Sequence, residues 1–361
     1  MLVADAPVRL HPLPRTVPVP TPPASKLDTP HLSVVIVNYR QWDNTARLTG
    51  QLRHSEALRR GLAEVIIVDN QSVVHPWRTK MRRQNGVSLR CLGRNRGFAR
   101  GVNEGCRLCR GEWFLLLNPD VTVPERFLDR VIALADEIQK QDPTAGVIGF
   151  RLENPDGSAQ GSVGKYPTLW RTLFGLLQPR SRRKCQPLST PKRLQVPWLT
   201  GCCLLIRREC LQQLGGFDPS FFLYYEDVDF CQRAWQNRWS VWYESQLHVT
   251  HHHPLHSRQV PPHIRLMTRQ ALLSYAHKHW PAWQLRTMTG LIWTEAKVRQ
   301  WWARRRGQRQ AVPVFAQLEE VARAFWQGEA AQAFRRVWRV AQAHGRAERG
   351  KVHAHAKLLP R

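Results

Sequence analysis

The sequence predicts an α/β fold, in which a mostly parallel sheet is flanked by helices and followed by a basic helical extension. Short runs of Val, Ile and Leu alternate with helix-length segments between residues 32 and 150, which is typical of a parallel sheet with covered faces. The runs are rich in β-branched residues or Leu, as expected for strands buried on both faces. Residues 282–361 contain 16 Lys and Arg against 5 Asp and Glu, and their Trp-rich pattern indicates two or three helices.

The predicted elements follow this alternation along the chain. Five runs are predicted to be buried strands: residues 32–37, 64–69, 87–92, 112–118 and 146–150. The helices between them are predicted at residues 42–56, 75–84, 99–110 and 124–140. Pro124 suits the first turn of the last of these helices, because the N–H that proline lacks has no intrahelical partner there.

The pattern changes after Phe150. Residues 157–195 are rich in Gly, Pro, Ser and basic residues without a clear period, and are predicted to be a mobile loop or insertion. Regular structure is expected again after this segment. The predicted elements are an apolar run at 196–208, a helix from about Asp227, a strand at 239–243 and a helix at 261–280. We therefore expect one α/β domain over residues 31–281. Residues 1–30 hold eight prolines and are predicted to form a disordered leader.

The composition of the chain indicates the class of its partner and its cellular compartment. The chain carries 54 Lys and Arg against 27 Asp and Glu, a net charge of +27, which indicates an anionic surface, ligand or polymer as a partner. Hydrophobic residues make up 42%, which excludes wholesale disorder. No apolar run approaches the roughly 18 residues that cross a bilayer, and the first residues lack the apolar core of a secretory signal. The eight cysteines are therefore expected to be reduced thiols of a cytoplasmic protein.

Polar residues directly follow the first four predicted strands. In a parallel sheet the carboxyl ends of the strands lie at one edge, where ligands bind. The residues expected at this edge are Asn38, Tyr39, Asp69, Asn95, Gly97, Asn118 and Asp120. An acidic residue at a strand end often caps a helix or forms a turn, so either Asp alone is weak evidence. Four polar strand ends at one edge indicate a ligand site.

Several motifs in consistent order resemble one family of enzymes. They are SVVIVNYR, IIVDN, NRGFARGVN, LLNPDV and, far downstream, TGCCLLIRRE followed by GGFDPSFFLYYEDVDFCQR. Over residues 32–257 the chain resembles the inverting glycosyltransferases of family 2, in particular their bacterial rhamnosyltransferase-like branch. The resemblance implies the GT-A fold of nucleotide-diphospho-sugar transferases. It also implies transfer of one sugar from a nucleotide-sugar donor, with dTDP-rhamnose favoured, to a hydroxyl of a lipid-linked or cell-surface glycan.

The resemblance assigns roles to the polar strand ends. It implies that Asp69 contacts the base of the donor and that Asp120 holds Mg²⁺ or Mn²⁺ on the pyrophosphate of the donor. A hard cation held by carboxylate oxygen neutralises the charge of such a leaving group. His251, in VTHHHPLHS, matches the position where relatives place a metal-binding His, although a solvated loop of histidines would have the same sequence. Further donor contacts are implied for Asn38, Tyr39, Asn95, Gly97 and Asn118.

Three carboxylates lie within four residues at Glu226, Asp227 and Asp229. They could cap a helix, because acidic side chains are favoured beside the first N–H groups of a helix. The resemblance instead makes Asp227 the base that deprotonates the acceptor hydroxyl, with Glu226 and Asp229 as orienting or structural neighbours. Like charges this close raise a carboxyl pKa, which suits a base. The aromatic residues at 221, 222, 224 and 225 are expected to form core and the wall of the acceptor pocket.

Two features leave alternatives open. Three arginines, Arg94, Arg96 and Arg100, surround the Gly-rich turn and could either bind phosphate or form a solvated basic turn. The loop after the second strand reads QSVVHPW where relatives often have Ser and then Asp-Gly, so contacts from this loop are not carried over to the chain.

The C-terminal region has two interpretations. One helical face is apolar, as expected for packing onto the catalytic domain, and comprises Val314, Leu318, Val321 and Phe325. A second group suits an interfacial helix on the anionic inner face of the cytoplasmic membrane, and comprises Trp293, Trp301, Trp302, Arg304, Arg305 and Arg306. The rival function is a basic nucleic-acid-binding protein without enzymatic activity. The charge is spread along the chain and no nucleic-acid-binding module is recognised, so we expect no nucleic acid as a partner.

Overall fold

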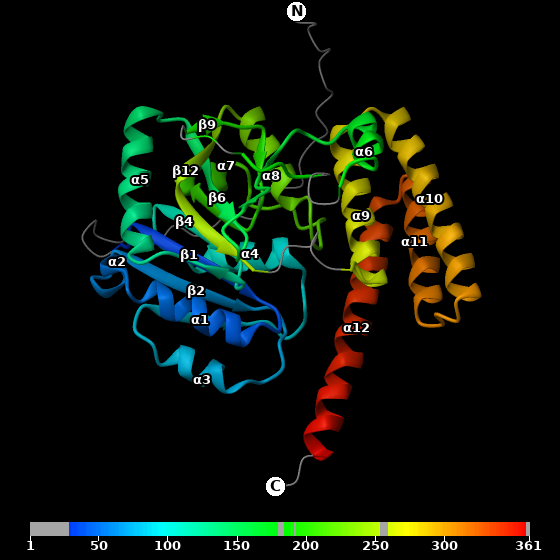
Figure 1. Cartoon of the computed structure of the whole chain (residues 1–361), viewed down its shortest axis with the longest axis horizontal. Helices are drawn as coiled ribbons and strands as arrows, with labels where there is room; N and C mark the ends of the chain where they lie inside the picture. The colour runs from blue at the N-terminus through cyan, green and yellow to red at the C-terminus, as the bar shows by residue number, and fades with distance from the viewer. Residues whose placement is uncertain (1–28, 180–183, 189, 191–192, 253–258, 359–361) are drawn as a thin grey trace, which may run out of the picture.

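The computed structural model describes residues 29–179, 184–188, 190, 193–252 and 259–358, with side chains described as far as Arg346. The leader predicted for residues 1–30 lies outside this range except for its last two residues. Figure 1 shows an α/β part that holds the sheet, beside a helical part. The helices of the helical part are α9 (Pro262–His279), α10 (Ala282–Arg305), α11 (Ala311–Trp326) and α12 (Ala330–Leu358).

The central sheet is mixed, with mostly parallel pairing among its first strands. Its order is β3-β2-β1-β4-β11-β6-β12-β5. The bounds are β1 Leu32–Asn38, β2 Ala63–Asp69, β3 Val87–Cys91, β4 Trp113–Leu117, β5 Val121–Thr122, β6 Ala145–Glu153, β11 Cys203–Arg207 and β12 Ser240–His251. β1 is parallel to β2 and β4, β2 to β3, and β6 to β12. β11 is antiparallel to both β4 and β6, and β5 is antiparallel to β12.

Helices cover both faces of this sheet. One face carries α1 (Trp42–Leu52), α2 (Glu56–Arg59), α3 (Pro76–Arg82) and α5 (Phe127–Gln141), and the other carries α4 (Phe98–Leu108) and α8 (Glu226–Gln236). Successive strand residues point to opposite faces. Val34 and Ile36 accordingly join the first apolar cluster, and Val35 and Val37 join the second. Burial on both faces explains why the middle of β1, residues 34–37, is continuously apolar.

Several predicted elements differ from the observed ones. β3 is an edge strand with alternating burial, so the expectation that this run is buried on both faces is wrong. The helix predicted at 42–56 is split into α1 and α2. α5 begins at Phe127, after Arg126 in a left-handed conformation (φ 54°), so Pro124 lies outside the first helical turn. The strand predicted at 239–243 continues to His251.

The segment predicted as an irregular loop, residues 157–195, contains regular structure where it is described. Its elements are β7 (Ala159–Gln160), β8 (Val163–Gly164), α6 (Leu169–Gly175) and β9 (Leu194–Gln195). They are followed by β10 (Trp198–Leu199) and α7 (Arg208–Gln213). Elements of two residues are too short to leave a periodic pattern in the sequence, which explains why the prediction missed them.

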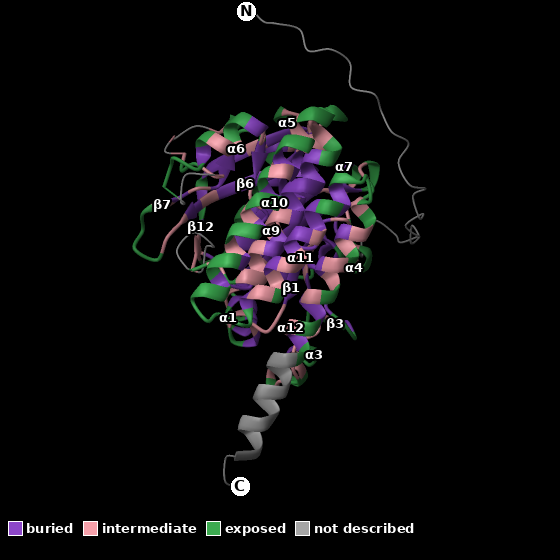
Figure 2. Ribbon diagram, turned by 90° about the vertical axis from the view of Figure 1, so that its right-hand side faces the viewer, coloured by how far each residue is buried: buried purple, intermediate pink, exposed green. Residues whose placement is uncertain are grey.

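The helical part has an apolar core of its own. Leu318, Val321 and Phe325 of α11 are buried in it, which confirms the predicted apolar face of this helix. α9 joins the two parts, because Ala271 and Tyr275 pack against the sheet while other α9 residues belong to the core of the helical part. Figure 2 shows buried residues both in the sheet and along α9, α10 and α11. Over the described residues, no helix combines the length and the apolar character that a bilayer crossing requires.

Candidate active site

A cavity of about 1240 Å³ lies at the carboxyl ends of the central strands. Most of the residues predicted as site residues line this cavity: Tyr39, Asn95, Gly97, Asn118, Asp120, Glu226, Asp227 and His251. Its remaining walls come from α6, α9, α10 and α12. Asp120 and Asp227 are separated by more than a hundred residues in the sequence, yet they share one cavity.

One edge of the cavity is formed by Tyr39, Asn95, Gly97 and Asn118, which are predicted donor contacts, and we call it the donor edge. Asn70, at the end of β2, organises this edge. Its side-chain amide donates to Oδ1 of Asn95 at 2.9 Å and to the carbonyl of Gly97 at 3.1 Å, and it accepts from the backbone N–H of Arg96 at 2.8 Å. These bonds hold the Gly-rich turn against β2. Asn70 also lines the cavity. It follows the second strand directly, in the VDN motif, but it was not among the predicted donor contacts.

Asn38 and Asp69 do not line the cavity among the described residues. Both are almost fully buried, and Asn38 Nδ2 lies 3.4 Å from Oδ1 of Asp69. The same carboxylate oxygen accepts from the backbone N–H of Ser72 at 2.9 Å. In this arrangement both side chains hold the loops that follow β1 and β2. Direct contact of either residue with a donor stays a prediction.

Gly97 allows the turn before α4 to approach the chain that precedes the acidic cluster. Its φ is +87°, and a Cβ atom there would lie 2.6 Å from the carbonyl oxygen of Phe222. That carbonyl accepts a hydrogen bond of 2.7 Å from the N–H of Phe98. Any side chain at position 97 would push apart two backbone segments that both line the cavity.

Gly97→Ala is therefore expected to reduce the free energy of unfolding by about 1–3 kcal/mol or more, because strain and a backbone clash coincide. Denaturant unfolding of the variant measures this loss. Gly93→Ala is the matched control, because a Cβ at Gly93 meets no atom within 4 Å and its φ is not positive. Equal stability of the two variants would contradict the role given to Gly97.

Asp120 and His251 form the candidate metal site. His251 Nε2 lies 3.6 Å from Asp120 Oδ1, because the pairing of β12 with β5 places His251 opposite Val121. Gln160 Oε1 lies 2.6 Å from Nδ1 of the same ring. The amide oxygen can only accept, so Nδ1 carries a proton and Nε2 is the ring atom that faces Asp120 and that would bind a cation.

This pair fits a divalent cation that also binds a diphosphate. No group of three or more His, Cys, Asp or Glu suited to a metal is found within the described residues. Two protein ligands are enough where phosphate oxygens and water complete the coordination, as is usual for Mg²⁺ and related ions. His252 lies instead 2.7 Å from Thr122 Oγ1, and His253 and His256 lie outside the described residues.

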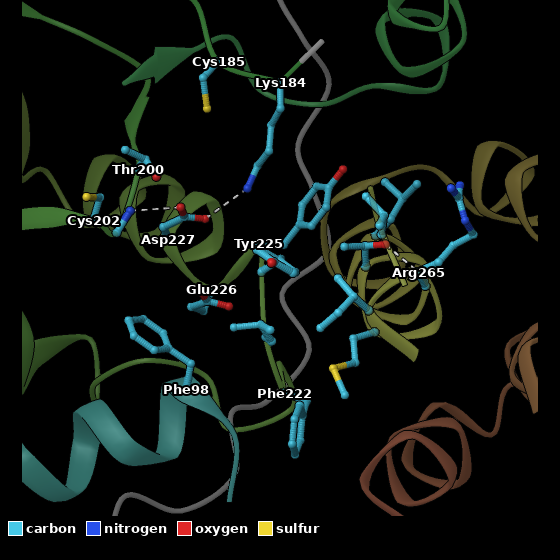
Figure 3. A pocket seen from close by; sticks show the side chains of 18 of the residues that line it. Phe98, Lys184, Cys185, Thr200, Cys202, Phe222, Tyr225, Glu226, Asp227 and Arg265 are labelled. Atoms are coloured by element: carbon cyan, nitrogen blue, oxygen red, sulfur yellow. Dashed lines mark hydrogen bonds and ion pairs between the residues drawn. The ribbon is translucent and has the colours of Figure 1, made fainter. Parts of the chain in front are cut away.

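Asp227 and Glu226 project from the first turn of α8. Tyr224 and Tyr225 precede them with φ values of +73° and +67°, an unusual pair of left-handed residues that turns the chain toward the cavity. Both tyrosines and Phe222 line the cavity, as expected for an acceptor-pocket wall. Figure 3 shows Glu226 and Asp227 on the same side of the cavity, with Lys184 reaching Asp227 from another wall.

Asp227 is held from two directions. Its Oδ2 accepts from the backbone N–H of Gly201 at 3.0 Å, and Lys184 Nζ lies 3.4 Å from Oδ1. Burial disfavours the charge on Lys184, but Asp227 and smaller contributions from Cys185, Tyr225 and Glu226 together outweigh it and raise the pKa of the ammonium group above its usual value. Lys184 comes from the segment predicted as a mobile loop, and no sequence pattern indicated that it would reach the site.

Glu226 differs from its neighbour. Its Oε2 is buried without a hydrogen-bond partner. Burial, followed by the charge of Asp227, raises the pKa of Glu226 to about 8. Glu226 is therefore mostly protonated at neutral pH, while both carboxyl oxygens of Asp227 have hydrogen-bond partners. This contrast supports the assignment of distinct roles to the two adjacent acids.

Glu226→Gln is expected to flatten the dependence of stability on pH. Between about pH 4.5 and 8 the folded protein retains a proton on Glu226 that the unfolded chain has released, so the stability of the wild type falls as pH rises through this range. Gln cannot ionise, and the variant should become more stable than the wild type toward pH 8.5 while matching it near pH 5. Denaturant unfolding at several pH values measures the difference, and parallel profiles would contradict the raised pKa.

Asp229, the third acid, does not line the cavity. It pairs with Arg233 at 2.8 Å, Lys278 at 2.6 Å and His279 at 2.9 Å. Burial opposes its ionisation, but these partners hold its pKa well below the usual range. Because Lys278 and His279 belong to α9, Asp229 ties α8 to α9. Of the two roles expected for this residue, the structure supports the structural one.

α12 covers the donor edge of the cavity. Gln342 donates to the carbonyl of Asn95, and Arg40 Nη2 donates to the carbonyl of Gly345 at 2.6 Å. Ala341 and His344 add to the cavity wall. Arg94 and Arg100 lie 5.3 Å from the ring centroids of α12 residues Trp338 and Phe334, respectively. Two of the three arginines that could have bound phosphate, Arg94 and Arg100, thus pack against α12, which no local motif could have indicated.

Comparisons with known proteins agree with this architecture. The family described as "Glycosyltransferase like family 2" matches residues 30–272. An N-acetylglucosaminyl-diphospho-decaprenol L-rhamnosyltransferase of Mycobacterium tuberculosis (strain ATCC 25618 / H37Rv) is 30% identical over 277 residues, which cover 70% of this chain and 86% of the relative. Rhamnosyltransferase WbbL of Escherichia coli (strain K12) is 24% identical over 151 residues, which cover 42% of this chain and 56% of the relative.

A solved structure shows the same fold. The crystal structure of GalNAc-T7 with UDP, GalNAc and Mn²⁺ superposes with a TM-score of 0.53 at 17% identity, over 76% of this chain and 51% of that chain. The likeness confirms the predicted GT-A fold, a mostly parallel sheet flanked by helices, to which the present chain adds the helical part α9–α12.

Proposed function

The chain belongs to glycosyltransferase family 2, and on this basis we propose that it transfers one sugar, with inversion, from a nucleotide-sugar donor to a hydroxyl of a lipid-linked or cell-surface glycan. The observation that carries the proposal is the single cavity that joins the Asp120–His251 pair to Asp227. Family membership also decides against the rival of a nucleic-acid-binding protein without enzymatic activity.

The proposed reaction has one displacement step. Asp227 accepts the proton of the acceptor hydroxyl while the hydroxyl oxygen attacks the anomeric carbon of the donor sugar. The bond between that carbon and the donor diphosphate breaks on the opposite side, so the configuration inverts. Lys184 and the N–H of Gly201 hold Asp227 in place for this proton transfer.

The donor edge would receive the nucleoside diphosphate. Asp120 and His251 would hold Mg²⁺ or Mn²⁺, which when bound neutralises charge on the leaving diphosphate. Tyr39, Asn95, Gly97 and Asn118 line the same edge and are proposed donor contacts. Two of the relatives are named rhamnosyltransferases, so we propose dTDP-rhamnose as the first donor to test.

A thermal-shift panel tests the proposed function on the full chain. Nucleoside diphosphates and nucleotide sugars, with and without Mn²⁺ or Mg²⁺, are expected to raise the melting temperature, with the correct donor requiring the cation. A radiolabelled donor and a lipid-linked glycan then report transfer. Absence of stabilisation by every nucleotide, together with salt-sensitive binding to random oligonucleotides, would contradict the proposal.

We also propose that the helical part binds the inner face of the cytoplasmic membrane. Trp293, Trp301 and Trp302 on α10 are 42%, 48% and 47% exposed. Arg305 and Arg306 each lie 4.8 Å from the ring centroid of one of these tryptophans. Exposed indole rings beside arginines suit the boundary between lipid headgroups and acyl chains when the lipid is anionic.

Replacing Trp293, Trp301 and Trp302 by Ser is expected to reduce flotation of the full chain with anionic phosphatidylglycerol vesicles several-fold, because interfacial binding scales with buried apolar area. Substitution of exposed side chains is preferable to removal of the helices, since α9 shares a core with α10 and α11. Val74→Ser, at an 80% exposed apolar residue of the α/β part, is the control. Equal flotation of both variants and the wild type would contradict this surface.

A further inference from the structure

Three arginines on one wall of the cavity share a single carboxylate. Arg265 and Arg269 of α9 and Arg299 of α10 lie 3.5, 2.7 and 2.8 Å from Glu295 oxygens. Burial favours the neutral form of Glu295, but Arg269 and Arg299 outweigh it and hold its pKa at about 2. Glu295 is therefore ionised at neutral pH, and this one carboxylate lies beside the guanidinium groups of three arginines.

These positive charges face the cavity. All three arginines line it, whereas Glu295 lies behind them and is not among the lining residues. Their side chains are only 26%, 26% and 37% exposed, so water screens them less than it screens arginines on an open surface. We call Arg265, Arg269 and Arg299 the arginine site. Lys165 and Arg171 add further positive charge to the cavity lining.

The arginine site lies on the acceptor side of the cavity. Figure 3 shows Arg265 beyond Tyr225 from Asp227, away from Phe98 and the donor edge. The donor diphosphate already has the Asp120–His251 pair with its cation, and the arginines near that edge, Arg94 and Arg100, do not line the cavity. The positive charge of the α9–α10 wall therefore suits a second anionic group, distinct from the donor diphosphate.

We propose that the arginine site binds a phosphate or diphosphate group carried by the acceptor, between the glycan and its lipid. This inference rests on the proposed function, because it places the acceptor hydroxyl at Asp227. Guanidinium groups bind phosphate oxygens through paired hydrogen bonds, so a wall with three arginines suits an anionic phosphate or diphosphate. The lipid would leave past α6, where Phe174 and Leu176 line the cavity and are also 64% and 52% exposed.

The test measures binding of farnesyl diphosphate to the full chain after dTDP and Mn²⁺ have saturated the donor edge. We expect farnesyl diphosphate to bind and farnesol to bind at least tenfold more weakly. The double variant Arg269→Gln with Arg299→Gln should weaken farnesyl diphosphate binding by about 10- to 100-fold, as for the loss of charge-assisted hydrogen bonds, and leave dTDP binding unchanged. Arg286→Gln, at an exposed arginine of α10 outside the cavity, should change neither.

Two further variants separate charge from folding. Replacing Arg269 and Arg299 by Lys keeps the charge but loses the paired hydrogen bonds, and should restore part of the affinity. Glu295→Gln removes the competing carboxylate and should tighten binding of farnesyl diphosphate. A Glu295→Gln variant that binds more weakly than the wild type would contradict the inference even if the arginine variants fail to fold.

The outcomes also separate the inference from the proposed function. If dTDP binds but farnesyl diphosphate binds no better than farnesol, the arginine site is wrong and the proposed function stands. If dTDP and every nucleotide sugar fail to bind, the proposed function fails first. If the arginine variants lose binding only to phosphatidylglycerol vesicles, the phosphate belongs to a lipid headgroup and the assignment to the acceptor is overturned.

Discussion

Asp227→Asn is expected to lower the rate of sugar transfer by about 10²- to 10⁴-fold while donor binding is retained. The amide has the shape of the carboxylate and can still accept a hydrogen bond from the N–H of Gly201, which lies 3.0 Å from Oδ2. It cannot accept the proton of the attacking hydroxyl. The loss should therefore appear in kcat, with the dissociation constant of a nucleoside diphosphate close to that of the wild type.

Glu226→Gln is the matched comparison, because it makes the same chemical change one residue away. Glu226 lies in the same cavity, and burial beside Asp227 raises its pKa to about 8. An acid that holds its proton at neutral pH is a poor base, so this variant should retain far more activity than Asp227→Asn. The reverse order of activities would show that Glu226 is the base.

Asp120→Ala is expected to abolish the part of donor binding that depends on metal, a loss of about 100-fold or more in the affinity measured with Mn²⁺. The variant retains His251 but loses the carboxylate that suits a hard cation. The dissociation constant of the nucleoside diphosphate should then be nearly the same with Mn²⁺ and with EDTA. Calorimetric titration under both conditions measures this ratio.

The two adjacent histidines provide the control for this site. His251→Ala should reduce the effect of Mn²⁺, because Nε2 of His251 faces Asp120 at 3.6 Å. His252→Ala should have little effect on it, because that ring lies against Thr122. A Mn²⁺ effect that survives in Asp120→Ala, or that depends on His252 rather than His251, would contradict the proposed ligand pair.

The local sequence pattern was sufficient to predict the central strands and the residues that meet at the donor edge. The central residues of β1, β2 and β4 are apolar because both faces of these strands are buried, and burial on both faces makes consecutive residues apolar. Parallel strands bring their carboxyl ends to one edge, so the convergence of Tyr39, Asn95, Asn118 and Asp120 could be predicted from strand order alone.

Local pattern was not sufficient for contacts between distant segments. His251 reaches Asp120 only through the pairing of β12 with β5, and Lys184 reaches Asp227 from a segment without periodicity. The resemblance implied a role for His251, but it could not show which atoms of the ring face which partner. α12 covers the Gly-rich turn through Gln342, more than two hundred residues away in the sequence.

The sequence by itself determined the fold class and the family, because burial on both strand faces and the spacing of short motifs are local properties of the chain. It also singled out Asp120, Glu226 and Asp227, which line the cavity, but equally Asp69 and Asp229, which do not. Only the tertiary structure decided that Asp229 ties α8 to α9, that Arg94 and Arg100 pack against α12, and that Arg265, Arg269 and Arg299 face the cavity. The physical reason is that the charge state and the partners of a side chain depend on its burial and on groups within a few ångströms. These groups come from distant segments, and the separation of two segments along the chain does not indicate their distance in space.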